Sequence, residues 1–271
     1  MKPAEWIAKA ARRLENAPYG DADAKYLAQW VTGKEGYELR FAGDMDDDTL
    51  SRLESALRRR LAGEPVQYIT GVAYFYGRAF RVDERVLIPQ PDTETLVERV
   101  LARGAGESAL DLCCGSGCIG LTIALESPGT RVVLADVDAG ALEVARANGG
   151  RMGIKARFAM GDMLRAVPGE RFDTIACNPP YIASGAIPAL PGDVRREPVI
   201  ALDGGSDGLD FYRVLAREAA EHLTEDGCLF AEIGFDQARD MERLFPGCRI
   251  VKDLGGNDRV MIAERKIVWG T

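Results

Sequence analysis

Residues 108–120 read SALDLCCGSGCIG, a short apolar run that passes directly into a loop containing three glycines. An apolar run of this length, followed by glycines, is typical of a buried strand that ends in a tight turn. Glycines after a first parallel strand let the backbone approach a bound cofactor closely. The spacing Gly115-x-Gly117-x-x-Gly120 is also that of a dinucleotide fingerprint, so a pyrophosphate ligand stays open at this point.

Short apolar strands alternate with amphipathic helices along the rest of the chain. Strands are predicted over 109–113, 132–137, 156–160, 172–177, 228–233, 249–252 and 259–263, and helices over 140–148, 209–222 and 236–244. This alternation predicts a doubly wound parallel α/β sheet. The link 255–258 is too short for a helical crossover, so the last two strands form an antiparallel hairpin. We expect a Rossmann-like sheet of seven strands with an antiparallel last strand.

The beginning of the chain has a different pattern. Apolar residues at helical spacing predict helices over 4–15, 23–31 and 46–60, and the aromatic run 74–82 predicts a β-hairpin around Gly77. Pro89 and Pro91 then lead into a helix that Asp92 or Thr93 would cap. The predicted organisation is a helical domain at 1–70, a β-hairpin linker at 71–92 and the α/β domain at 93–271.

The amino-acid composition argues against several classes of function. Of 271 residues, 34 are Lys or Arg and 42 are Asp or Glu, and the net charge of −8 argues against binding nucleic acid through a broad basic field. No run of eighteen apolar residues and no leader-like segment is present, so we expect a cytoplasmic protein without a membrane segment. Six cysteines and a single histidine lack the spacing of a zinc site, which predicts reduced thiols and no metal. One histidine also makes a Ser/His/Asp or Cys/His catalytic group improbable.

Asp136 ends the second predicted strand, about 25 residues after Asp111. A carboxylate at this place accepts hydrogen bonds from both hydroxyls of a ribose, which NAD and S-adenosylmethionine share. The alternative is that Asp136 caps the next helix.

The segment Asn178-Pro179-Pro180-Tyr181 follows the fourth predicted strand and separates the two cofactors. Two successive prolines fix the backbone, remove two N–H donors and leave carbonyls free to accept. The Asn side chain offers an oxygen and the Tyr side chain a flat face. Together they suit a planar –NH2 group, whose two hydrogens need two acceptors. The alternative is a turn with no functional role. The position at the carboxyl end of a strand, opposite a glycine loop, favours a substrate-binding site.

With these residues the chain resembles the HemK-type protein-(glutamine-N5) methyltransferases, within the group that methylates amino nitrogens of planar substrates from S-adenosylmethionine. The resemblance extends over residues 64 to 264. It rests on Asn178 to Tyr181 and on EPVQYITG at 64–71, LIP at 87–89, DTE at 92–94, DVRREP at 193–198, AL at 201–202 and DGL at 207–209.

This resemblance implies a specific reaction. S-adenosylmethionine would give its methyl group to the side-chain nitrogen of the glutamine in the Gly-Gly-Gln motif of peptide chain release factors, leaving S-adenosylhomocysteine, and the helical N-terminal domain would help to hold the protein substrate. The implied catalytic and substrate-binding residues are Asn178, Pro179, Pro180 and Tyr181, with the Asn178 oxygen and the Pro179 carbonyl as acceptors and Tyr181 packed on the amide. The implied cofactor residues are Asp111 by the methionine part, Cys113, Cys114, Gly115, Ser116 and Gly117 in the loop, Asp136 on the ribose, Asp162 and Met163 at the adenine, and Asn178.

The sequence departs from the family pattern at two positions. The loop usually begins Asp-x-Gly-x-Gly-x-Gly, and here Cys113 replaces the first glycine. The residue after Pro89 is usually Arg, and here it is Gln90, which lacks the charge.

Three other functions fit part of this sequence pattern. A methyltransferase acting on adenine N6 or guanine N2 would share the chemistry at Asn178, but the acidic net charge and the lack of a second large base-reading domain disfavour stable nucleic-acid binding. A non-enzymatic cofactor-binding or ribosome-associated module would bind the cofactor without transferring a methyl group. A nicotinamide oxidoreductase lacks a proton-transfer residue in this sequence.

Overall fold

The computed structural model describes residues 1–17 and 19–270, and the chain divides into two compact units. The helical unit comprises Met1–Val72 and the short segment Pro191–Arg196. The α/β unit comprises Ala73–Leu190 and the chain from Glu197 onward. Among the described residues, no helix is both long enough and apolar enough to cross a membrane.

Among the described residues of the helical unit, five helices surround one apolar core. They are α1 (Pro3–Arg13), α2 (Gly20–Thr32), α3 (Gly36–Phe41), α4 (Asp47–Leu61) and α5 (Val66–Thr70). Trp6, Leu27, Leu53 and Leu57 are almost completely buried in this core. Helix α4 begins as the acidic run predicts, because the Asp46 side chain accepts a hydrogen bond from the Thr49 N–H at 2.7 Å. Helices α3 and α5 were not predicted, since five or six residues are too few to show a helical period.

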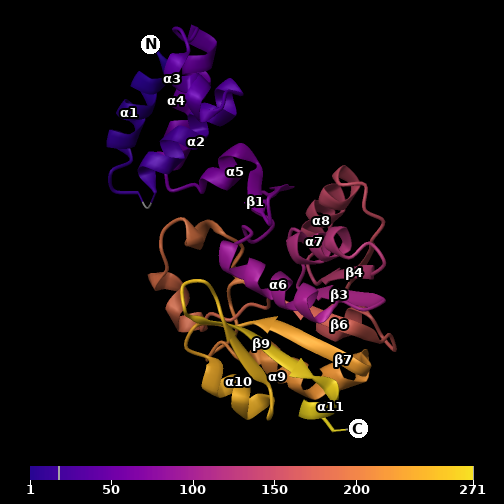
Figure 1. Ribbon diagram of the computed structural model, residues 1–271. Coiled ribbons are helices and arrows are strands. Elements are labelled where there is room, and N and C mark those ends of the chain that lie inside the picture. The colour runs from indigo at the N-terminus through magenta and orange to yellow at the C-terminus, as the bar shows by residue number, and fades with distance from the viewer. Residues whose placement is uncertain (18, 271) are drawn as a thin grey trace. The chain divides into compact units, whose positions relative to one another are not determined.

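The α/β unit is built on a seven-stranded sheet of order β5-β4-β3-β6-β7-β9-β8 (Figure 1). Its strands are β3 (Ser108–Leu112), β4 (Arg131–Asp136), β5 (Arg157–Met160), β6 (Phe172–Cys177), β7 (Leu223–Glu232), β8 (Arg249–Lys252) and β9 (Asp258–Glu264). Strands β3 to β7 run parallel, whereas β9 pairs antiparallel with both β7 and β8. The predicted fold class is therefore confirmed.

Helices cover both faces of this sheet. The helices are η1 (Pro91–Thr93, a 3-10 turn), α6 (Glu94–Arg103), α7 (Cys118–Glu126), α8 (Ala139–Arg151), α9 (Asp210–Glu218), α10 (Ala238–Leu244) and α11 (Arg265–Val268). Helices α6, α7 and α8 pack on one face around one apolar core, and α9, α10 and α11 pack on the other face around a second (Figure 1). The helix predicted over 209–222 is shorter, because its last turn, Ala219–His222, is a 3-10 helix.

A separate two-stranded hairpin precedes the sheet, with β1 at Val72–Phe75 and β2 at Arg78–Arg81. Tyr76 and Gly77 at its tip both have positive φ, 51° and 71°. Two such residues are what a tight hairpin turn requires. The buried rings of Phe75 and Phe80 meet edge to face, with centroids 6.1 Å apart, and join the core beneath α6 and α7.

Candidate active site

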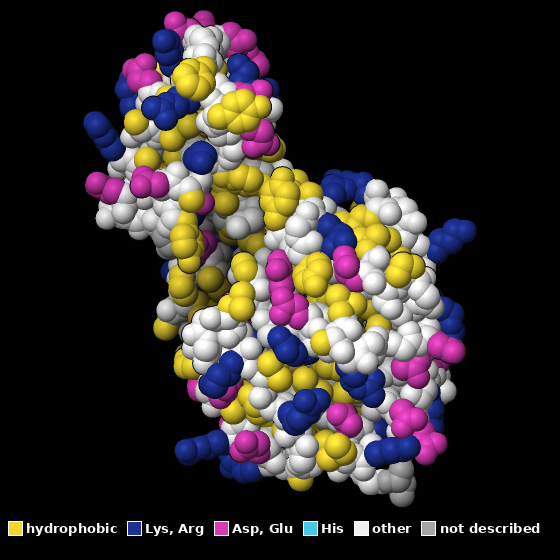
Figure 2. All heavy atoms as spheres, viewed as in Figure 1, with side chains coloured by type: hydrophobic (Ala, Val, Ile, Leu, Met, Phe, Trp, Pro, Cys, Tyr) yellow, Lys and Arg dark blue, Asp and Glu magenta, His cyan; other side chains and the backbone are white. Residues whose placement is uncertain are grey.

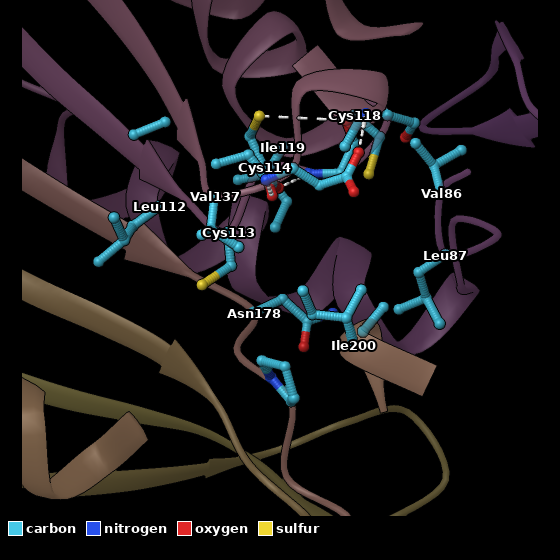
Figure 3. A pocket seen from close by; sticks show the side chains of 18 of the residues that line it. Val86, Leu87, Leu112, Cys113, Cys114, Cys118, Ile119, Val137, Asn178 and Ile200 are labelled. Atoms are coloured by element: carbon cyan, nitrogen blue, oxygen red, sulfur yellow. Dashed lines mark hydrogen bonds between the residues drawn. The ribbon is translucent and has the colours of Figure 1, made fainter. Parts of the chain in front are cut away.

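A cavity opens at the carboxyl ends of β3, β4 and β6 (Figure 3). It holds about 920 Å³ free of protein atoms, its open mouth included. Parallel sheets bind ligands at this edge, where the strand order reverses. Its walls come from 85–90, Thr93, 112–116, Cys118, Ile119, 135–138, Ala141, 161–163, Asn178, Pro180, Ile200, Ala201 and Phe211.

The glycine loop between β3 and α7 forms one wall of the cavity. Gly115 and Gly117 have φ of 51° and 79°, a conformation that glycine adopts without penalty. A Cβ on Gly117 would lie 2.9 Å from a methyl of Leu134, so the loop packs too closely on β4 for any side chain there. Cys114, Gly115 and Ser116 line the cavity as predicted for cofactor-binding residues, whereas Gly117 lies behind them and shapes the turn.

Cys113 lies in the cavity wall in the left-handed conformation, with φ of 57°. A residue with a Cβ is strained in this region by roughly 1 kcal/mol or more. The Cys113 Sγ lies 3.7 Å from the Met163 Sδ, which fills space that a glycine would leave empty. A glycine would adopt this backbone conformation without strain, whereas the cysteine contributes a contact between its sulfur and Met163.

We expect Cys113→Gly to raise the free energy of unfolding by about 0.5–1 kcal/mol, because the left-handed strain disappears. The affinity for S-adenosylmethionine should stay the same or increase, whereas Cys113→Leu should lower it by placing a larger side chain in the cavity wall. Denaturant unfolding and calorimetric titration of both variants measure these effects. Equal cofactor affinity in both variants would place Cys113 away from the ligand.

Asp136 at the end of β4 has both carboxylate oxygens on backbone donors. Oδ2 accepts from the Gly115 N–H at 2.9 Å and Oδ1 accepts from the Asp138 N–H at 3.0 Å. Each oxygen retains a further lone pair, which the two hydroxyls of a ribose can use. Helix α8 is capped by Asp138, whose side chain accepts from the Ala141 N–H at 2.8 Å. Burial raises the pKa of Asp136.

The loop after β5 contributes Asp162 and Met163 to the cavity. Met163 is buried and has a positive φ of 50°. Asp162 is exposed and its carboxylate lies 3.4 Å from the Arg165 guanidinium. Both residues line the cavity, and their place at an adenine stays a prediction.

Asp111 lies beneath the loop and does not line the cavity. It is completely buried in β3, where its Oδ2 accepts a hydrogen bond from the Gly120 N–H at 2.8 Å. Within the described part of the chain its Oδ1 has no hydrogen-bond partner. Burial raises the pKa of this carboxyl well above its ordinary range. Any contact with a ligand in the cavity would therefore be indirect, and the visible contact of Asp111 is with the first turn of α7.

The four residues 178–181 are not equally placed with respect to the cavity. Asn178 and Pro180 line it, and Figure 3 shows Asn178 bordering the same open space as Cys113, Leu87 and Ile200. Pro179 is buried beside them and does not line the cavity. Tyr181 also turns away from the cavity, and its hydroxyl donates to the Glu232 carboxylate at 3.3 Å.

Behind Asn178 lies a hydrogen-bonded group that the sequence interpretation missed. The Asn178 Nδ2 donates to the Thr93 Oγ1 at 3.3 Å, and the Thr93 hydroxyl donates to the Glu232 Oε2 at 2.5 Å. Thr93 therefore does not cap α6 with its side chain, and neither does Asp92, which pairs with Arg259 at 3.2 Å. The signal for this group was a carboxylate at the end of the apolar strand residues 228–231.

Glu232 is 2% exposed, and burial raises its pKa to about 7 despite its hydrogen bonds and the nearby Arg259. Because this value lies above the ordinary 4.5, the contribution of Glu232 to stability is greatest below about pH 4.5 and is lost as the pH rises through 7. Relative to Glu232→Gln, the wild-type protein should lose about 2 kcal/mol of stability between about pH 5.5 and 7.5. Denaturant unfolding of both proteins at several pH values measures the difference; a constant difference would contradict the raised pKa.

Residues 85–88 and 200–201 complete the walls and were not predicted as site residues. The buried Glu197 carboxylate accepts from the Ile88 N–H at 2.8 Å and so fixes the first of these segments. Gln90 turns its side-chain amide back onto the Ile88 carbonyl at 3.0 Å. The segment interpreted as part of a linker therefore also forms a cavity wall.

Among residues 1–17 and 19–270, no three or more His, Cys, Asp or Glu side chains gather as a metal ion would require.

The seven-stranded sheet with its antiparallel last strand and the cavity at its carboxyl edge fit a Rossmann-like methyltransferase. Residues 5–71 match the model of the PrmC N-terminal domain, and residues 90–189 match that of the methyltransferase small domain. A methyltransferase from Pyrococcus furiosus shares the fold with a TM-score of 0.53 at 19% identity, covering 81% of this chain and 99% of that one.

Two proteins of related sequence identify the family more closely. The release factor glutamine methyltransferase of Neisseria gonorrhoeae is 43% identical over 252 residues, which cover 89% of this chain and 92% of that protein. The release factor glutamine methyltransferase of Moorella thermoacetica is 42% identical over 257 residues, with 90% and 91% covered. The chain belongs to the family of release factor glutamine methyltransferases.

Proposed function

We propose that this chain methylates the side-chain amide nitrogen of the glutamine in the Gly-Gly-Gln motif of peptide chain release factors. The observation that carries the proposal is Asn178, which borders the cavity with its NH2 group on Thr93 and its carbonyl oxygen left as an acceptor. A substrate amide presents the –NH2 group that such an acceptor fits. The names of the relatives support the same substrate.

We propose that S-adenosylmethionine binds in this cavity. Asp136 would hold the ribose hydroxyls, and the backbone of Cys113–Gly117 would follow the rest of the nucleoside with little steric hindrance. Met163 and Asp162 would flank the adenine, with the Asp162 carboxylate accepting from its amino group. Asp111 would act on the methionine part through the loop or a water molecule. The cofactor supplies an electrophilic methyl group and leaves as S-adenosylhomocysteine, and no metal is needed.

The main role of the protein residues would be to position the glutamine amide nitrogen next to the methyl group of the cofactor. A carboxamide nitrogen is a poor nucleophile because its lone pair is delocalised into the carbonyl. The Asn178 oxygen and the Pro179 carbonyl would accept its two N–H bonds and hold it in line with the methyl group, about 3 Å away. Pro180 would fix the direction of these acceptors, and Tyr181, which faces Glu232 and not the cavity, would support the segment from behind. The methylated nitrogen is strongly acidic, so it loses its proton without a general base.

We propose that residues 1–70 form the domain that helps to bind the release factor, that 71–92 connect it, and that 93–271 carry out the reaction in the cytoplasm. The principal alternative is methylation of an exocyclic base amine in rRNA or DNA. Figure 2 shows basic and acidic side chains interspersed over the visible face, without a continuous basic area. Together with the net charge of −8, this favours the protein substrate.

Mass spectrometry of a purified release factor, incubated with the enzyme and S-adenosylmethionine, tests the proposal. We expect a gain of one methyl group on the glutamine of the Gly-Gly-Gln motif. A variant release factor with Asn in place of this glutamine is the matched control and should gain none. Methyl transfer to RNA, with none to the release factor, would contradict the proposal.

A further inference from the structure

The side chain of Asn178 is useful as an acceptor only if its amide has one orientation. The oxygen must face the cavity, because a rotation of 180° about the Cβ–Cγ bond would present the NH2 group instead, and two NH2 groups cannot pair. The contact that distinguishes the two orientations is the one to Thr93, where the Asn178 Nδ2 and the Thr93 Oγ1 are 3.3 Å apart.

A hydroxyl can either donate or accept in that contact, so Thr93 alone does not determine the orientation. Its single hydrogen is taken by Glu232, whose Oε2 lies 2.5 Å from the Thr93 Oγ1. Because its pKa is about 7, the Glu232 carboxyl is ionised above that pH, and an ionised carboxylate only accepts hydrogen bonds. Thr93 must therefore donate to Glu232, and only its lone pairs face Asn178, which must then donate its NH2 group.

The surroundings of Glu232 keep this direction fixed. The Tyr181 hydroxyl donates to the other carboxylate oxygen at 3.3 Å, and the Tyr212 hydroxyl donates to the backbone carbonyl of Glu232 at 2.7 Å. Arg259, held between Asp92 and Asp253 at 3.2 and 3.1 Å, supplies a nearby positive charge. The carboxylate thus has donors on both oxygens and a cation beside it in a buried place.

We infer that Thr93 is a positioning residue, which transmits the acceptor character of the Glu232 carboxylate to Asn178 and so turns the Asn178 oxygen toward the substrate amide. This inference rests on the proposed function, because it assumes that Asn178 accepts from the target nitrogen. On this inference, Thr93 and Glu232 affect the reaction by orienting the Asn178 amide, and neither side chain contacts the reacting atoms.

The test is Thr93→Val, which keeps the shape of the side chain and removes the hydroxyl. With Asn178 free to turn, the kcat for methylation of the release factor should fall about 10- to 100-fold, the effect of losing one positioned hydrogen bond in a buried site. The dissociation constant for S-adenosylmethionine should change less than about 3-fold, since the hydroxyl makes its hydrogen bonds to Asn178 and Glu232 and not to the cofactor loop. Thr93→Ser, which restores the hydroxyl, should recover most of the kcat.

Thr174→Val is the matched control. Thr174 is a completely buried threonine of β6 whose hydroxyl has no hydrogen-bond partner among the described residues, so its loss should leave kcat and cofactor binding unchanged. Glu232→Gln is a second route to the same effect, because a Gln has one acceptor oxygen for the two hydroxyls and should lower kcat as well.

A Thr93→Val protein with the kcat of Thr174→Val would overturn the inference. A parallel loss of kcat, cofactor affinity and folding stability would also overturn it, since a purely structural contact would produce that pattern. Failure of the wild-type enzyme to methylate the release factor would instead refute the proposed function, so the two failures are distinguishable.

Discussion

Replacing Asn178 by alanine should slow methyl transfer about 30- to 1000-fold, which corresponds to roughly 2–4 kcal/mol in the barrier. The substitution removes one of two proposed acceptors for the target amide, and an N–H group is then left without a partner in a site that excludes water. The Asn178 side chain borders the cavity opposite the glycine loop and makes its visible hydrogen bond to Thr93, not to that loop. Cofactor affinity should therefore change much less than the rate.

The measurement compares single-turnover rates at saturating S-adenosylmethionine with the calorimetric dissociation constant of the same preparation. Asn257→Ala is a suitable control, because Asn257 is an exposed asparagine in the β8–β9 turn. Circular dichroism and unfolding curves show whether the fold is intact. A variant with weakened cofactor binding but near-normal turnover at saturation would refute a role for Asn178 in the chemical step.

Replacing Asp136 by alanine should weaken S-adenosylmethionine binding by about 1.5–3 kcal/mol, or roughly 10- to 150-fold. The alanine removes the acceptors for the ribose hydroxyls. It also releases the Gly115 N–H, which Asp136 holds at 2.9 Å, so the loop loses part of its preorganisation. Asp136→Asn keeps one acceptor oxygen, and its loss of affinity should be smaller.

Calorimetric titration with S-adenosylmethionine measures both variants. Asp46→Ala, which removes the N-cap of α4 in the helical unit, is the control for the loss of a carboxylate that binds a backbone N–H. It should lower stability by about 1 kcal/mol and leave the dissociation constant unchanged. An unchanged dissociation constant in Asp136→Ala would remove Asp136 from the ribose site.

Two predicted residues come together at the cavity because of their places at strand ends. Asp136 is the last residue of β4 and Asn178 directly follows β6, and in a parallel sheet the carboxyl ends of the strands lie at one edge. Local sequence therefore suffices to place them at the same cavity. The same reasoning put Asp111 by the methionine part, acting through water, and this stays a prediction: Asp111 lies within β3, one residue before the strand end, and its carboxylate accepts from the Gly120 N–H.

Residues that act on the site from other elements were not predictable in this way. The sequence predicts either Asp92 or Thr93 as the cap of the following helix, since both residue types are favoured there. The Thr93 hydroxyl instead donates to Glu232, which is 139 residues away in sequence. A pairing of this kind leaves no local periodicity, and the only local signal was a charged residue at the end of an apolar strand.

The sequence by itself determined the seven-stranded sheet, its antiparallel final hairpin, the glycine loop and the Asn-Pro-Pro-Tyr segment. These features depend on side-chain period, on loop length and on proline and glycine geometry, all of which act over a few neighbouring residues. Only the tertiary structure decided that Cys113 adopts the left-handed conformation and that the Glu232 carboxylate is buried behind Asn178. Both depend on what other strands and loops bring within a few ångströms, because burial and hydrogen-bond direction are properties of packing and not of the local chain.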